Sequence, residues 1–126
     1  MSEGTDKYRS SKEYLLVYAE LINAARYRGV TTYQAVAQIM GLPMTGNHMG
    51  REVGQVLGEI SHEEIQNGRP MLSALAVGTS GVPGDGFYTW AKDLGRLSDD
   101  SKQTKEQFWR QECEAVYSAW KREFKE

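Results

Sequence analysis

The chain has 126 residues, of which 40% are hydrophobic and 25% are charged, so disordered and fibrous classes are excluded for all but the ends. The net charge of −2 does not give the basic surplus that is usual in nucleic-acid-binding proteins. A single cysteine forms no internal disulfide, and no apolar run approaches the roughly 20 residues that span a bilayer, so we expect a cytoplasmic protein without membrane insertion.

One folded domain is expected over residues 11–126, because a chain of this size buries a core without disulfides or metals. Residues 1–10 are polar, with Tyr8 as the one anchor, and predict a disordered N-terminus. From Ser11 to Arg28, apolar side chains recur at helical spacing and Gly29 supplies a stop signal. The first helix is therefore predicted over residues 11–28.

The next segment predicts a pair of helices. Val30 and Thr31 suit a minimal strand, and Thr32 stands where the N-cap of a short helix belongs. That helix is predicted to end at Gly41, and a turn separates it from a longer helix over residues 49–66. Within the longer helix, the apolar side chains that face the core are those of Val53, Val56, Leu57 and Ile60.

A ridge of glycines follows one flank of this longer helix, at Gly50, Gly54 and Gly58. Each interior glycine costs about 1 kcal/mol relative to alanine, so close packing must offset the loss. Two explanations account for the ridge: another element of the protein packs against it, or it lets the helix approach a ligand such as DNA. In the second case Arg51 and Gln55 reach the bases.

After the helices, the sequence predicts a β-hairpin. Residues 71–77 form a nearly continuous apolar run of strand length, and the glycine-rich segment 78–86 suits a mobile hairpin tip. A second strand is expected near Phe87, followed by a short helix over residues 90–97 that ends near Gly95. The hairpin depends on an extended conformation around Leu75.

The C-terminal part predicts a linker over residues 98–105 and a final amphipathic helix, with Thr104 and Gln107 as its capping box. One stripe of this helix is heavily aromatic. It either closes the core against the first helix or docks a protein partner or a second copy. The stripe consists of Trp109, Cys113, Val116, Tyr117, Trp120 and Phe124.

No catalytic, metal or cofactor site is predicted, and we expect the protein not to be an enzyme. Cys113 lies within the aromatic stripe, where burial makes a thiol unreactive. His48 and His62 have no further ligands at zinc spacing. The loop over residues 78–86 has glycines that suit phosphate binding but lacks the G-K-[ST] ending of a P-loop.

The middle of the chain resembles the winged-helix DNA-binding domain of the alkyltransferase and alkyltransferase-like proteins. Residues 32–37 (T-Y-Q-A-V-A) are similar to the T-Y-x-x-V-A opening helix of that family, and residues 51–54 (R-E-V-G) to its R-x-V-G recognition helix. Pro70 followed by an apolar run and a glycine-containing turn continues the likeness, which covers residues 31–86. The family's alkyl-accepting P-C-H-R is Pro70-Met71-Leu72-Ser73 in this chain, so alkyl transfer is excluded.

The sequence thus predicts an α+β, winged-helix-like fold with a first helix, a helix-turn-helix, a β-hairpin wing and a C-terminal amphipathic helix. The predicted function is non-catalytic binding of double-stranded DNA, which requires Arg51 and Gln55 to be exposed. Asp85 in the wing and Glu59 oppose contact with phosphate. The alternative is a protein-interaction module on the same scaffold. The predicted DNA contacts are His48, Arg51 and Gln55 from the longer helix and the hydroxyls of Thr79 and Ser80 from the wing.

Overall fold

The computed structural model describes residues 7–43, 47–98 and 101–122. The fold is α+β and mostly helical, with one small parallel sheet. The elements follow in the order α1 (Lys12–Arg26), β1 (Thr31–Thr32), α2 (Tyr33–Met40), α3 (Asn47–Gln66), the 3-10 helix η2 (Leu72–Leu75), β2 (Ala76–Val77), α4 (Asp85–Asp93) and α5 (Lys102–Ala119).

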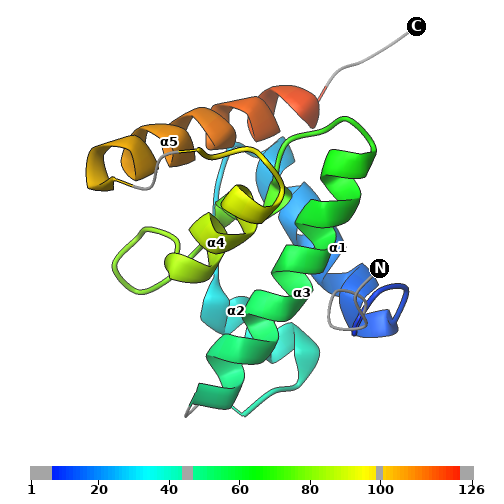
Figure 1. Ribbon diagram of the computed structural model, residues 1–126. Coiled ribbons are helices and arrows are strands. Elements are labelled where there is room, and N and C mark those ends of the chain that lie inside the picture. Colours follow the sequence, from blue (N-terminus) through cyan, green and yellow to red (C-terminus); the bar gives the residue numbers. More distant parts are fainter. Residues whose placement is uncertain (1–6, 44–46, 99–100, 123–126) are drawn as a thin grey trace, which may run out of the picture.

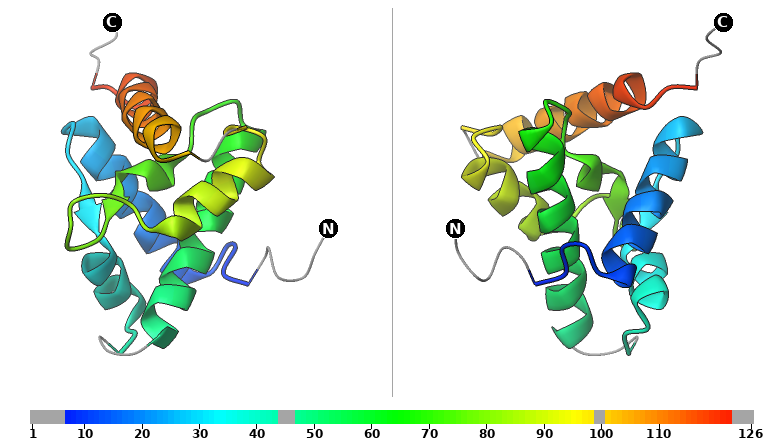
Figure 2. Two further views of the ribbon diagram at one scale, coloured as in Figure 1. Left: turned by 60° about the vertical axis from the view of Figure 1, so that its left-hand side comes forward. Right: turned by 90° about the vertical axis from the view of Figure 1, so that its right-hand side faces the viewer.

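Helix α3 runs through the middle of the molecule, between α1 on one side and α4 on the other (Figures 1 and 2). Helix α5 crosses the end of the molecule where α3 terminates (Figure 1). The core lies between α1, α2, α3, η2 and α5, and its largest fully buried apolar side chains include Leu21, Ile60, Met71, Leu72 and Leu75. No helix in the described part of the chain has the length and apolar character needed to cross a bilayer.

The predicted starts of α1 and α2 and the predicted end of α2 are confirmed by their caps, whereas α1 ends at Arg26, before the predicted end at Arg28. The Ser11 hydroxyl accepts a hydrogen bond from the Tyr14 amide and begins α1. The Thr32 hydroxyl accepts from the Ala35 amide at 3.0 Å and begins α2. Gly41 ends α2 with a left-handed φ of 74°, a conformation that favours glycine. The short polar and glycine signals in the sequence therefore fix the helix pair.

The predicted β-hairpin is wrong. Strands β1 and β2 pair in parallel, with Thr31 opposite Ala76, and the intervening α2 and α3 make the crossover that a parallel pair requires. Most of the apolar run that we expected as a strand coils into η2, which includes Leu75. A continuous apolar run has no period, so it does not distinguish a buried strand from a buried helical turn.

The second strand expected near Phe87 is also wrong, because that residue lies in α4. Gly84 is the N-cap and Asp85 occupies the first turn, where a negative charge favours the helix dipole. The glycines and the proline that we assigned to a hairpin tip therefore precede a helix. Gly95, expected to end a helix, follows α4 with a φ of 75°.

Helix α5 closes the core, as one of the two explanations of its aromatic stripe requires. It begins at Ser101, whose hydroxyl accepts from the Thr104 amide, so the capping box predicted at Thr104 lies three residues too late. Residues 99–100 and Phe124 lie outside the described residues. The aromatic side chains reach inward: Trp109 donates to the Ala74 carbonyl at 2.9 Å, Tyr117 to the Gly29 carbonyl at 2.9 Å, and Trp120 to Glu64 at 3.3 Å.

The N-terminus differs from the predicted disorder where the structure describes it. Residues 7–10 lie against α3: the Tyr8 amide donates to Glu59 at 2.8 Å and Lys7 pairs with Glu52 at 2.5 Å. Residues 1–6 lie outside the described residues. Tyr8 was the one anchor predicted in this segment, and its docking site could not be predicted because both partners are more than forty positions away in the chain.

Candidate functional site

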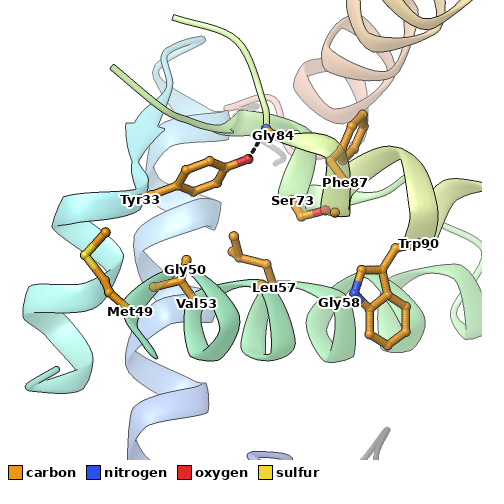
Figure 3. A pocket seen from close by; sticks show the side chains of 12 residues that line it. Tyr33, Met49, Gly50, Val53, Leu57, Gly58, Ser73, Gly84, Phe87 and Trp90 are labelled. Atoms are coloured by element: carbon orange, nitrogen blue, oxygen red, sulfur yellow. Dashed lines mark hydrogen bonds between the residues drawn. The ribbon is translucent and has the colours of Figure 1, made fainter. Parts of the chain in front are cut away.

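A pocket of about 250 Å³ opens along the flank of α3 that faces α4 (Figure 3). Helix α2 contributes Tyr33, which points across the pocket toward Gly84 (Figure 3). Helix α4 contributes Phe87 and Trp90. The floor is α3 itself, through Met49, Gly50, Val53, Gly54, Leu57 and Gly58. Apolar, aromatic pockets with few polar atoms are typical of small-molecule binding sites.

The structure confirms the close-packing explanation of the glycine ridge at one of its three glycines. A Cβ built on Gly58 falls 1.9 Å from the Trp90 ring, so this glycine is required by close packing within the protein. A Cβ built on Gly50 or Gly54 meets no atom of the described chain within 4 Å. The bare backbone of these two glycines therefore faces the open pocket, where it lets a ligand approach α3 closely.

Two hydroxyl groups supply polar character inside the pocket. The Tyr33 hydroxyl accepts a hydrogen bond of 2.6 Å from the Gly84 amide, which leaves its own hydrogen to be donated to a ligand. Burial raises the pKa of Tyr33, so this hydroxyl remains protonated at neutral pH. The Ser73 hydroxyl accepts from Ser61 at 2.7 Å, and its hydrogen is likewise left to be donated.

The residues of α3 that were predicted to contact DNA lie at its exposed side, next to the glycine ridge. The Arg51 side chain is 71% exposed and sits 3.7 Å from Glu52 and 3.3 Å from the His48 ring. Gln55 is half-buried and donates to Glu59 at 2.7 Å. The predicted exposure of Arg51 is thus confirmed, and Gln55 is held against the helix.

Three of the four glutamates of α3 are buried, namely Glu52, Glu59 and Glu64. Glu59, which we expected to oppose phosphate, is 2% exposed and does not itself lie on the open surface. Hydrogen bonds from Lys7 and Tyr8 hold the pKa of Glu52 down at about 2, so this carboxylate stays ionised. The bonds are made as follows: Lys7 and Tyr8 to Glu52, the Tyr8 amide and Gln55 to Glu59, Tyr14 to Glu63, and Tyr18 and Arg69 to Glu64.

The two predicted wing hydroxyls are exposed in the loop between β2 and α4, whose tip is closed by a bond from the Gly78 amide to the Val82 carbonyl. Thr79 lines a smaller hollow of about 150 Å³ together with Tyr33 and Met49, which also line the main pocket. Thr79 therefore lies beside the pocket. Ser80 lines neither hollow.

Sequence reasoning missed the side chains that shape the pocket, namely Tyr33, Met49, Phe87 and Trp90. Tyr33 belongs to the T-Y-x-x-V-A motif, which was a signal for it, but we assigned that tyrosine only to the predicted short helix. Phe87 was assigned to a strand, and Trp90 to the start of a later short helix. Both side chains line the pocket because they lie on α4, and the start of this helix was not predicted because the residues there are glycine-rich.

Neither the residue in place of the family's cysteine nor the thiol of Cys113 lines the pocket. Met71, which stands in place of the family's cysteine, is fully buried, and its amide donates to Glu112 at 2.9 Å. The predicted burial of Cys113 is confirmed, and burial raises the pKa of its thiol to about 11. Within residues 7–43, 47–98 and 101–122, no three His, Cys, Asp or Glu side chains come together as a metal site.

Comparisons of the chain with protein-family models, with curated proteins and with solved structures find no match.

Proposed function

We propose that the protein binds double-stranded DNA along the exposed side of α3 and receives an unstacked base in the pocket beside it, without catalysing a reaction. The observation that carries this proposal is the aromatic, apolar pocket that opens on the same helix as the exposed Arg51. Proteins that hold a base outside the duplex stack it between aromatic and apolar side chains and bond its polar edge. Tyr33, Phe87 and Trp90 supply the walls, and the Tyr33 and Ser73 hydroxyls supply polar atoms.

The distribution of charge supports the proposal more than the net charge does. Phosphate contacts require a surface without opposing carboxylates. All four glutamates of α3 are engaged by partners from the N-terminal segment, α1, α3 itself and the chain after α3. An overall charge of −2 is therefore compatible with a DNA-facing α3.

The likeness to the alkyltransferase and alkyltransferase-like domain supports the same function for the α2–α3 pair, while the hairpin wing is absent from the proposal. In its place we assign the loop over residues 78–84, whose position is tied to Tyr33 through Gly84. Thr79 in this loop is suited to a phosphate contact. The replacement of the family's cysteine by Met71 is the reason that binding, rather than alkyl transfer, is proposed.

Fluorescence anisotropy with a labelled duplex tests the proposal. We expect binding that weakens as salt increases, and a loss of about 1–3 kcal/mol in binding free energy for Arg51→Ala. A duplex with one mismatched pair should bind more tightly than its fully paired counterpart, because unstacking a mismatched base costs less. Absence of binding at low salt would refute the DNA proposal. Equal affinity of Arg51→Ala and the wild type would refute the assignment of α3 as the helix that contacts DNA.

A second candidate is a protein-interaction module, and one observation favours it. Leu15 and Leu16 are adjacent on the outer side of α1 and are 60% and 48% exposed. The aromatic face of α5, which we first considered for docking or dimerisation, packs against the core and donates bonds inward. A partner would thus bind at α1. A molar mass above that of the monomer in light scattering, lost in Leu15→Ser, would support this candidate.

A further inference from the structure

Glu52 is shared between the N-terminal segment and the proposed DNA-contacting arginine. Its Oε1 atom accepts from the Lys7 ammonium at 2.5 Å and from the Tyr8 hydroxyl. Its Oε2 atom lies 3.7 Å from Arg51 Nε. The Glu52 side chain is 7% exposed, whereas that of Arg51 is 71% exposed. One nearly buried carboxylate therefore sits under an arginine that extends into solvent.

We propose that Lys7 and Tyr8 are positioning residues for Arg51, because they occupy Glu52 and so leave the guanidinium directed toward DNA. The inference rests on the proposed function. Arginine and carboxylate groups pair most strongly through two parallel hydrogen bonds. With one carboxylate oxygen held by Lys7 and Tyr8, Glu52 offers Arg51 only the other oxygen.

Loss of Lys7 or Tyr8 removes a hydrogen-bond donor from the Glu52 carboxylate. A nearly buried carboxylate that loses a donor is costly: without Lys7 the nearest remaining cation is Arg51, and without Tyr8 the Oε1 atom keeps Lys7 as its one donor. Arg51 would then fold down along α3 to bind both carboxylate oxygens. Its guanidinium would leave the exposed side, and its positive charge, neutralised by Glu52, would attract phosphate less strongly.

The other charged groups around the pair do not replace Lys7. His48 contacts Arg51 at 3.3 Å from the preceding turn, and Glu59 is already bound by the Tyr8 amide and by Gln55. Arg9, from the N-terminal segment, lies beside a later turn of α3, with its Nε atom 3.9 Å from Glu63 Oε1. Lys7 and Tyr8 are thus the two side chains from outside α3 that hold Glu52 in the described structure.

Tyr8→Phe against Tyr14→Phe is the matched test. Each variant removes one hydroxyl donated to a glutamate of α3 and changes no charge, but Tyr14 bonds to Glu63 rather than to Glu52. We expect similar losses of stability in the two variants, with duplex affinity reduced about two- to threefold in Tyr8→Phe alone. Lys7→Ala should lower the affinity about three- to tenfold, and Lys12→Ala serves as its charge-matched control.

A rescue double variant and an NMR measurement on the DNA-free protein complete the experiment. Adding Glu52→Gln to Tyr8→Phe should abolish the loss of about two- to threefold and restore wild-type affinity, since no carboxylate remains to capture Arg51. In ¹H–¹⁵N spectra without DNA, the Arg51 Nε–H resonance should shift in Tyr8→Phe and stay in place in Tyr14→Phe.

The outcomes separate this inference from the proposed function. If the wild type binds DNA and the two tyrosine variants lose affinity equally, or the Arg51 resonance does not move, the positioning role is refuted while DNA binding stands. If the wild type binds no duplex at low salt, the proposed function fails and this inference fails with it.

Discussion

On the flank of α3 that faces α1, carboxylates are buried against tyrosines and cations; on the flank that faces α4, bare glycine backbone meets an apolar hollow. The first flank is polar but closed, because each of its glutamates has a partner. The second is apolar but open at Gly50 and Gly54. Burying the charges and exposing the apolar surface reverses the usual arrangement. The difference teaches that the polar flank stabilises the fold, whereas the apolar flank leaves open the surface that we propose for a ligand.

The largest effect is expected on the closed flank, at Glu64. This fully buried carboxylate accepts two bonds from Arg69 Nε and NH2 at 2.8 and 2.9 Å, besides bonds from Tyr18 and Trp120. Glu64→Ala leaves these donors without an acceptor and should lower the free energy of unfolding by about 3 kcal/mol. Urea denaturation measures the loss. The control is Glu106→Ala, which breaks an exposed pair with Arg110 and should cost about 0.5 kcal/mol or less.

A smaller loss is expected from Gly58→Ala at the closed end of the glycine ridge. The added methyl overlaps the Trp90 ring, so the indole must shift and α4 with it. Overpacking of this kind costs roughly 1–3 kcal/mol. Urea denaturation followed by tryptophan fluorescence reports both the stability and the displaced ring. Unchanged stability and an unchanged emission spectrum would show that Trp90 does not pack on Gly58.

Low pH should lower the stability of the protein by protonating Glu52 on the closed flank. Its pKa is lowered from the ordinary 4.5 to about 2, so its contribution is fully present above pH 4.5 and is lost as pH falls from 4.5 toward 2. Thermal unfolding followed across that range should show a decline that is shallower in Glu52→Gln. A decline of the same slope in both proteins would argue against a strongly bound Glu52 carboxylate.

The smallest effect on stability, and of opposite sign, is expected at the open end of the ridge. Gly54→Ala meets no neighbouring atom and gains helix propensity, so it should stabilise the protein by up to about 1 kcal/mol. The same methyl narrows the pocket and should reduce the affinity for a mismatched duplex. Stabilisation combined with weaker binding would separate the two roles of the ridge, whereas unaltered affinity would place the base elsewhere.

The sequence predicted the elements that have local signals. Ser11 and Thr32 cap their helices, Gly41 ends α2, and the spacing of apolar residues gave α1, α3 and α5. The hairpin failed because the apolar run at residues 72–75 has no period and coils where several helices cover it. The exposure of Arg51 was predicted because its spacing placed it on the polar side of the helix.

The pocket was beyond sequence reasoning because it joins segments distant in the chain. Tyr33, Leu57 and Trp90 meet only after α2, α3 and α4 have packed together (Figure 3). Likewise, the hold of Tyr8 on Glu52 spans 44 positions and leaves no local pattern. Spacing along one helix indicated the glycine ridge, yet only the packed structure shows which glycine touches Trp90 and which two are open.

The contrast between the two flanks is tested most directly by ¹H–¹⁵N spectra of the ¹⁵N-labelled protein titrated with a mismatched duplex. We predict that the amides of Gly50, Gly54, Gly84 and Gly86 and the Trp90 indole N–H shift most, since they surround the pocket. The largest shifts at Tyr14, Tyr18 and Glu63 on the flank toward α1, with the pocket resonances unmoved, would contradict the assignment of the open flank as the ligand-binding side.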